Sequence, residues 1–411
     1  MAGKNNCVSR WRWTAIAVLL LFASAAFAQA PAPEEKGSAA ADKRARAIEL
    51  YRNRKQVEAL PLFEELAVET PSDPLVQEGL GVCLISHSST IADADKRSDE
   101  VKRAREALAK AKELGDSSEI VRILLEVTPA DGKIPAFSGC GDVETAMREG
   151  EAAFARRDLD AAIAAYQRAM MLDPELYSAP LYVGDSYFTK KDYDNAGKWF
   201  AVAIAVDPDK ETAYRYWGDA LVAQNKLDEA HDEFIEAVIA DPYSQKSWVG
   251  LGHWAKPAGV QLTQPRIESP NKLSGENGKI SITIDPNSLN KNDGSTAWTV
   301  YEMSRAHWKT KFATVFPNEK EYRHSLPEEA EALSAVASVV RELPPEKTAN
   351  LSPMLKTLLE LKDHGLLEAY ILFAKADAGI AKDYGAYRNG HRDELRRYLK
   401  EYVGVEKAEK K

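Results

Sequence analysis

Small and hydrophobic positions recur with a period of 34 residues through the middle of the chain. The clearest set is Gly150, Gly184, Gly218 and Gly252. The same spacing separates Ala162, Ala196 and Ala230; Ala169, Ala203 and Ala237; Tyr166, Phe200 and Phe234; and the Asp-Pro pairs at 173–174, 207–208 and 241–242. Such a period indicates a repeat architecture of stacked units.

Each unit has the pattern of two antiparallel helices. Ala162, Tyr166 and Ala169 are spaced +4 and +3, which places them on one face of a helix. The small residues Gly150 and Ala162 let two helices approach closely, and Asp160 is expected to cap the second helix and to complement its dipole. Asp-Pro then ends the pair, because proline donates no hydrogen bond and disfavours helical geometry in the preceding residue.

The segment Gly-Asp-Ser-Tyr-Phe-Thr-Lys-Lys-Asp-Tyr-Asp-Asn-Ala, residues 184–196, resembles the tetratricopeptide repeat. The resemblance implies an all-α-dominated fold, a right-handed α-solenoid of helix pairs with a concave inner surface. It covers three full repeats and a capping helix in 143–255. Weaker repeats occupy 42–128, one of them with eleven extra residues expected as a loop around 86–95, and 129–142 reads as a linker.

The last third of the chain departs from the repeat. Residues 256–293 alternate apolar and polar positions between prolines and glycines, which predicts a two-stranded hairpin that pairs the region of Val260 and Leu262 with Ile280–Ile284. Residues 294–403 read as a helical module, with Ser325 and Glu328 as a capping box, and 404–411 as a charged tail.

The N-terminus has the pattern of an export signal. Basic residues precede a short apolar run that ends in Ala26-Phe27-Ala28, so 1–28 is interpreted as a cleavable signal peptide and 29–41 as a disordered tether. An uncleaved membrane anchor is the alternative. With cleavage, we expect a secreted protein, periplasmic or extracellular, without stable membrane insertion.

Composition is that of a folded protein of several domains: 411 residues, 45% hydrophobic and 28% charged, with a net charge of −9. This charge argues against a nucleic-acid binder, because phosphate contacts need clustered basic residues. The negative excess lies in the middle array, where residues 143–244 hold 20 acidic and 10 basic side chains. A basic or amide-rich protein partner would be attracted there.

The resemblance also implies a peptide-binding groove. One position per repeat, directly after the glycine, faces the concave side in this family; three positions later comes a second. The corresponding residues are Glu151, Asp185, Asp219 and His253, and Phe154, Phe188 and Val222. The groove would be acidic with an apolar floor, unlike the basic clamps that hold acidic tails. Alternatively, these acids only bond the neighbouring repeat.

Few residues suggest other chemistry. No common hydrolase, nucleotide-binding or metal motif occurs, so no cofactor, metal or catalytic residue is expected. Cys83 and Cys140 could form a disulfide in an oxidising compartment; alternatively, Cys83 is a small buried helix residue and Cys140 is a free loop thiol.

We therefore expect a non-catalytic scaffold that binds another polypeptide. A second hypothesis is an enzyme or a small-ligand or metal-binding protein whose pocket in the C-terminal module joins Arg305, His307, His324 and Glu328. A third is an assembly subunit whose repeats bind each other or a larger complex.

Overall fold

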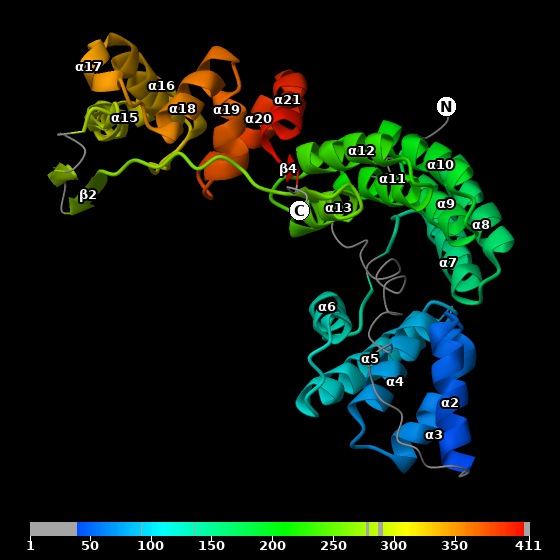
Figure 1. The fold of residues 1–411 in the computed structure, drawn as a ribbon. Helices are drawn as coiled ribbons and strands as arrows, with labels where there is room; N and C mark the ends of the chain where they lie inside the picture. Colours follow the sequence, from blue (N-terminus) through cyan, green and yellow to red (C-terminus); the bar gives the residue numbers. More distant parts are fainter. Residues whose placement is uncertain (1–38, 92, 135, 277–278, 287–290, 407–411) are drawn as a thin grey trace, which may run out of the picture. The chain divides into compact units, whose positions relative to one another are not determined.

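The computed structural model describes residues 39–406 except 92, 135, 277–278 and 287–290 (Figure 1). The chain divides into two compact units, 1–208 and 209–411. The expected signal peptide, 1–28, and residues 29–38 of the expected tether lie outside the described residues. The tether prediction is wrong for 39–41, since helix α2 begins at Ala39.

The first unit is built from helix pairs, as the 34-residue period predicts. Its elements are α2 (Ala39–Arg52), α3 (Gln56–Glu69), α4 (Pro74–Ser88), α5 (Ala94–Glu113), α6 (Glu119–Val127), α7 (Gly141–Ala155), α8 (Leu159–Leu172), α9 (Ser178–Thr189) and α10 (Tyr193–Val206). Consecutive helices pack as α2–α3, α4–α5, α7–α8 and α9–α10. The predicted class, helix pairs of an α-solenoid, is confirmed.

Within a pair, a glycine on the first helix receives a large side chain from the second. A Cβ atom placed on Gly150 would lie 2.3 Å from the Tyr166 ring, so only glycine admits this contact. Gly81 meets Leu108 in the same way across α4 and α5. The weaker N-terminal repeat is therefore packed like the clear ones, despite its eleven extra residues.

The loop in this repeat is shorter than expected, because part of 86–95 belongs to the two helices. Helix α4 continues to Ser88, and α5 begins at Ala94 behind the N-cap Asp93. The Asp93 side chain accepts hydrogen bonds from the backbone N–H groups of Asp95 and Lys96, which fixes this helix start.

The helix caps differ by two residues from the prediction. Asp158, and not Asp160, is the N-cap of α8, and its carboxylate accepts a hydrogen bond from the N–H of Ala161 at 3.2 Å. Asp160 lies in the first turn, where its charge complements the helix dipole. The turn before the cap is made by Arg157 in the left-handed region, with φ 63°, and Lys191, 34 residues later, has φ 64°.

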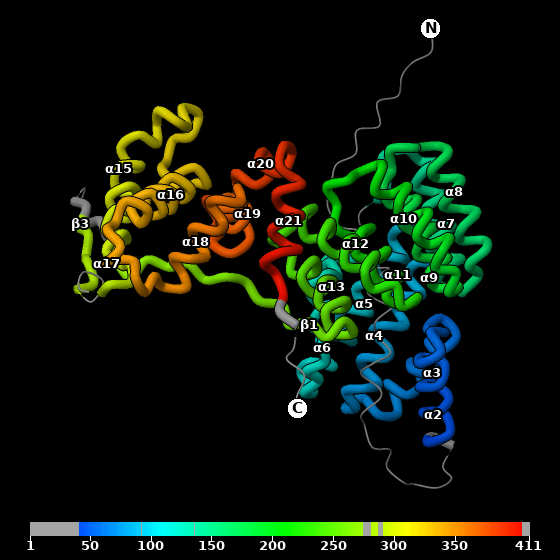
Figure 2. The backbone as a smooth tube through the Cα atoms, turned by 45° about the horizontal axis from the view of Figure 1, so that its top comes forward, coloured from blue at the N-terminus to red at the C-terminus, as the bar shows by residue number. Residues whose placement is uncertain are grey.

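The second unit joins the last repeat to the C-terminal module (Figure 2). Its helices are α11 (Glu211–Ala223), α12 (Leu227–Ala240), α13 (Gln245–Ala255), η2 (Ser295–Trp298), α15 (Thr299–Val315), α16 (Leu326–Glu342), α17 (Pro345–Thr348), α18 (Pro353–Asp363), α19 (Leu367–Tyr370), η3 (Ile371–Lys375), η4 (Ile380–Asp383), α20 (Tyr384–Gly390) and α21 (Arg392–Tyr402). One hydrophobic core runs through them, from Phe234 on α12 to Trp298, Leu333 and Tyr398.

The predicted strand pairing is wrong. Strand β2 (Lys272–Glu276) pairs with β3 (Lys279–Thr283) in an antiparallel hairpin. Strand β1 (Val260–Gln261) instead pairs with β4 (Val405–Glu406), inside the segment expected to be a charged tail. The region of Val260 therefore finds its partner nearly 150 residues later, which local alternation could not indicate.

Candidate functional site

Glu151, the first predicted groove acid, is a buried side chain on α7. It is 8% exposed, and the Tyr166 hydroxyl on α8 donates a hydrogen bond to Glu151 Oε1 at 2.7 Å. Burial raises the pKa of Glu151 more than the bond from Tyr166 lowers it. This acid is therefore engaged within its own repeat.

Asp185, one repeat later on α9, is equally enclosed. It is 6% exposed, and burial followed by the nearby charge of Glu151 raises the pKa of Asp185 to about 7, against the opposing influence of Arg54. Near neutral pH this carboxyl group exchanges between its neutral and charged forms.

The aromatic positions of the first unit are more accessible than the acids. Phe154 on α7 and Phe188 at the end of α9 are both half-buried. Phe188 packs edge-to-face on Tyr193, with ring centroids 5.4 Å apart. Both residues therefore keep part of their surface available for contact, and Tyr193 fixes the orientation of the Phe188 ring.

In the second unit the structure brings two predicted site residues together. His253 Nδ1 on α13 lies 2.8 Å from Asp219 Oδ1 on α11, and this hydrogen bond raises the pKa of His253. Val222 is partly buried against the hydrophobic core. Asp219 thus bonds the neighbouring repeat, the arrangement that the sequence analysis gave as the alternative to a groove role.

Two of the five acidic residues on α12, and Asp209 before α11, pair with basic residues near the C-terminal end of the chain, which the sequence analysis missed. Arg396 Nε on α21 donates to Glu236 Oε1 at 2.7 Å, and Lys400 Nζ lies 2.5 Å from Asp232 Oδ1. Arg388, on α20, pairs with Asp209 at 2.5 Å. The basic face of 388–400 was a readable signal, because α21 is strongly amphipathic.

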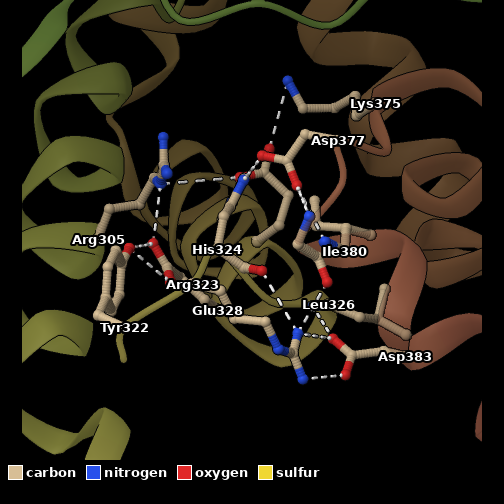
Figure 3. Close-up of polar contacts among 12 residues, drawn as sticks. Arg305, Tyr322, Arg323, His324, Leu326, Glu328, Lys375, Asp377, Ile380 and Asp383 are labelled. Atoms are coloured by element: carbon tan, nitrogen blue, oxygen red, sulfur yellow. Dashed lines mark hydrogen bonds and ion pairs between the residues drawn. The ribbon is translucent and has the colours of Figure 1, made fainter. Parts of the chain in front are cut away.

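Three of the four residues named for a C-terminal pocket do converge (Figure 3). Arg305 on α15 donates from Nε to Glu328 Oε1 at 3.1 Å, and the Tyr322 hydroxyl donates to the same carboxylate at 2.8 Å. His324 lies beside them and contacts Glu329. His307 is exposed on α15, and no contact joins it to this cluster within the described residues.

The cluster is held by opposite charges. His324 lies between the carboxylates of Glu329, at 3.1 Å, and Asp377, at 2.9 Å, while Lys375 Nζ lies 3.3 Å from Glu329 Oε1. Burial opposes both charges, but the mutual hydrogen bonds prevail: the pKa of Glu329 is lowered and that of His324 is raised. Because these charges compensate one another, the cluster acts as a cross-link between α15, α16 and the segment after η3.

Two further properties bear on the site. Among the described residues, no group of three or more His, Cys, Asp or Glu side chains is placed to hold a metal ion. Over the same part of the chain, no helix combines the length and the apolar character needed to cross a membrane.

The possible disulfide between Cys83 and Cys140 is not formed. Cys83 is a free thiol, fully buried inside α4, and its burial raises its pKa. It serves as a small core residue next to Val82 and Leu84, which is the alternative that the sequence allowed.

Comparison with known proteins supports the repeat interpretation. A tetratricopeptide-repeat family model matches residues 147–211. No curated protein matches the chain.

Several solved structures are similar to the chain. They include the first TPR of Spaghetti (RPAP3) bound to an HSP90 peptide, with 23% identity over 28% of this chain and 93% of that chain, TM-score 0.27. MamA has 19% identity over 51% and 97%, TM-score 0.25. The TPR2AB domain of yeast Sti1 in complex with HSP90 has 17% identity over 53% and 98%, TM-score 0.27. Residues 147–211 therefore match the tetratricopeptide-repeat family, in agreement with the helix pairs α7–α8 and α9–α10.

Proposed function

We propose that this protein is an exported, non-catalytic scaffold that holds a segment of another polypeptide on the first helices of its repeats. The tetratricopeptide match over 147–211 supports a role in protein–protein interaction. In the first unit, the contacting surface would include Phe154 and Phe188; in the second unit, Val222 occupies the same repeat position.

The observation that carries the proposal is the partial exposure of Phe154 and Phe188. A residue needed only for the packing of a helix pair would be buried, as Tyr166 and Phe200 are. Two half-buried rings at the same repeat position are instead typical of a preformed contact surface, where aromatic residues dominate binding energy.

The proposed partner is basic or amide-rich because of Asp185. A cationic group placed beside this carboxyl would favour its ionised form and would lower its pKa from about 7. Binding would then release a proton near neutral pH, and affinity would rise between pH 6 and pH 8. Asp219 would contribute less, since its carboxylate already makes a hydrogen bond with His253 at 2.8 Å.

The test is capture of partners from the native cell envelope with matched variants. Phe154→Ala combined with Phe188→Ala should reduce the captured partner at least tenfold. Met171→Ala, which truncates a side chain 73% exposed on α8, is the control and should change nothing. Equal recovery with all three proteins would refute the proposed surface.

Export is tested separately. We expect the mature protein to begin at Gln29 and to fractionate with the periplasm or the medium. N-terminal sequencing that finds residues 1–28 intact on a cytoplasmic protein would contradict this part of the proposal.

A further inference from the structure

The first unit contains a pocket of about 50 Å³ lined by two arginines. Arg54 belongs to the turn between α2 and α3, and Arg157 to the turn between α7 and α8. Both have left-handed backbones, with φ 58° and 63°, so the two turns have the same geometry. The pocket lies where the N-terminal repeats and the middle repeats of this unit meet.

The charges around the pocket are mostly positive. Burial lowers the pKa of Arg54. The nearby positive charge of Arg157 lowers it further, because the two cations repel each other. Glu151 is the one carboxyl side chain of the lining, and burial raises its pKa, which reduces its negative charge, although the hydrogen bond from Tyr166 favours the charged form. The charge of Asp185, which does not line the pocket, opposes the lowering of the pKa of Arg54. An anion in the pocket would relieve the repulsion.

Two polar side chains of the lining have no hydrogen-bond partner among the described residues. Gln56, the first residue of α3, is 7% exposed as a residue, but its amide atoms are not fully enclosed. Thr189 Oγ1 is buried and unpartnered within the same part of the chain. Leaving a buried hydroxyl unsatisfied is costly, so its retention at this cavity supports a ligand that satisfies it.

Helix α3 adds to the positive potential at Gln56. Its N-cap, Lys55, forms no side-chain capping bond, so the first N–H groups of this helix are not capped by that residue. Helix N-termini favour anions through these N–H groups and the helix dipole.

We propose that this pocket binds a small oxyanion, a carboxylate or a phosphate group, between the guanidinium groups of Arg54 and Arg157. The Gln56 amide and the Thr189 hydroxyl are its neutral hydrogen-bond donors, and Phe154 contacts the apolar part of the molecule that carries it. The fork of an arginine side chain matches both anions.

The size of the pocket agrees with this assignment. A cavity needs about 10–15 Å³ to hold one water molecule, so 50 Å³ admits a group of a few heavy atoms and excludes a large cofactor. The inference goes beyond the proposed function, because a free anion could fill the site whether or not a polypeptide binds to the repeats.

The test is titration of the full-length protein with inorganic phosphate and, separately, with acetate, with sodium chloride keeping the ionic strength constant. Calorimetry should detect binding of at least one of the two anions. Binding of phosphate alone would indicate a ligand with a phosphate group, and binding of acetate alone a ligand with a carboxylate. If neither binds more tightly than chloride, the proposal fails.

Matched variants locate the site. Arg157→Gln should weaken binding at least tenfold, whereas Lys191→Gln should leave it within twofold. Lys191 occupies the same left-handed turn position one repeat later but does not line the pocket, so both variants lose one charge in the same backbone geometry. Equal weakening by both would indicate only a general charge effect and would overturn the proposal.

Gln56→Leu separates binding from folding. Because the Gln56 side chain forms no hydrogen bond within the described residues, an apolar group of similar size should preserve the melting temperature without anion, while binding of phosphate or acetate falls. Wild-type affinity in this variant would overturn the assignment of Gln56 as a ligand.

Discussion

Arg323 and Asp383 form a two-point ion pair, with Nη2 2.6 Å from Oδ1 and Nη1 2.9 Å from Oδ2. The same Asp383 carboxylate accepts a hydrogen bond from the N–H of Leu326 at 2.8 Å, at the first turn of α16 (Figure 3). Asp383 therefore does the capping that was predicted for Ser325, whose hydroxyl is buried and makes no capping bond.

Asp383→Ala should destabilise the second unit by about 2–4 kcal/mol, because it leaves Arg323 and a helix N–H without their shared acceptor. Asp363→Ala removes the acid of an exposed pair with Arg341 and should cost less than about 1 kcal/mol. Urea unfolding followed by tryptophan fluorescence measures both, since Trp298 and Trp308 are buried in this unit. Similar losses in the two variants would contradict the role assigned to Asp383.

Two glycines at the same repeat position should respond oppositely to alanine. Gly150→Ala forces a Cβ atom into the Tyr166 ring and should cost about 1–3 kcal/mol. At Gly252 no atom lies within 4 Å of the added Cβ, so alanine should stabilise α13 by about 0.5–1 kcal/mol through its helix propensity. Thermal unfolding of the two variants checks this. Destabilisation by both would show that the repeat position itself, and not the aromatic contact, requires glycine.

The helix pairs were predictable because their determinants recur along the chain. Three units repeat the glycine and the aromatic residue that fill each other's space: Gly150 with Tyr166, Gly184 with Phe200, and Gly218 with Phe234. The cap of α16 was not predictable, since the group that replaces Ser325 comes from Asp383, 57 residues beyond Leu326. The hairpin had a signal that was overlooked: Asn277-Gly278 separates β2 from β3 in the sequence, and this dipeptide favours two-residue turns.

The candidate site was only partly readable. The period identifies which residues share a position, such as Glu151 and Asp185, but not how deeply they are buried. That depends on side chains from other helices, such as Tyr166 above Glu151. Similarly, a count of acidic residues in the middle array cannot show that Arg396, far along the chain, pairs with Glu236.

Asp185→Asn should make the stability of the first unit less dependent on pH. The unfolded chain ionises Asp185 above its ordinary pKa of 3.8, whereas the folded chain keeps the proton until about pH 7. The folded state therefore loses stability as the pH rises from about 4 to 7, and at higher pH the loss is constant. Asparagine removes this penalty, so the variant should be more stable at pH 8 by at most about 4 kcal/mol and unchanged near pH 4.

Unfolding curves of both proteins at pH 4, 6 and 8 measure the difference. Asp160→Asn is the control, because Asp160 is exposed in its pair with Lys190 and should shift stability by less than about 1 kcal/mol. A gain in Asp185→Asn that is the same at pH 4 and pH 8 would rule out ionisation as its cause.

The pairing of α12 with α21 should tolerate exchange of its charges but not reversal of one of them. The Glu236 carboxylate lies 2.7 Å from Arg396 and 3.3 Å from Arg392. Glu236→Lys would place a cation there, facing both arginines. We expect a loss of about 1–2 kcal/mol in the second unit, partly restored when Arg396→Glu is added, because the ion pair is re-formed with opposite polarity. Glu229→Lys, on an exposed side chain of the same helix, should have little effect. The coupling should weaken in 1 M salt, where partly exposed charges are screened.

If the double variant is no more stable than the sum of the single losses predicts, the charges do not position α21. In that case the hydrophobic contacts around Tyr398 and Phe234 alone hold α21 on the last repeat.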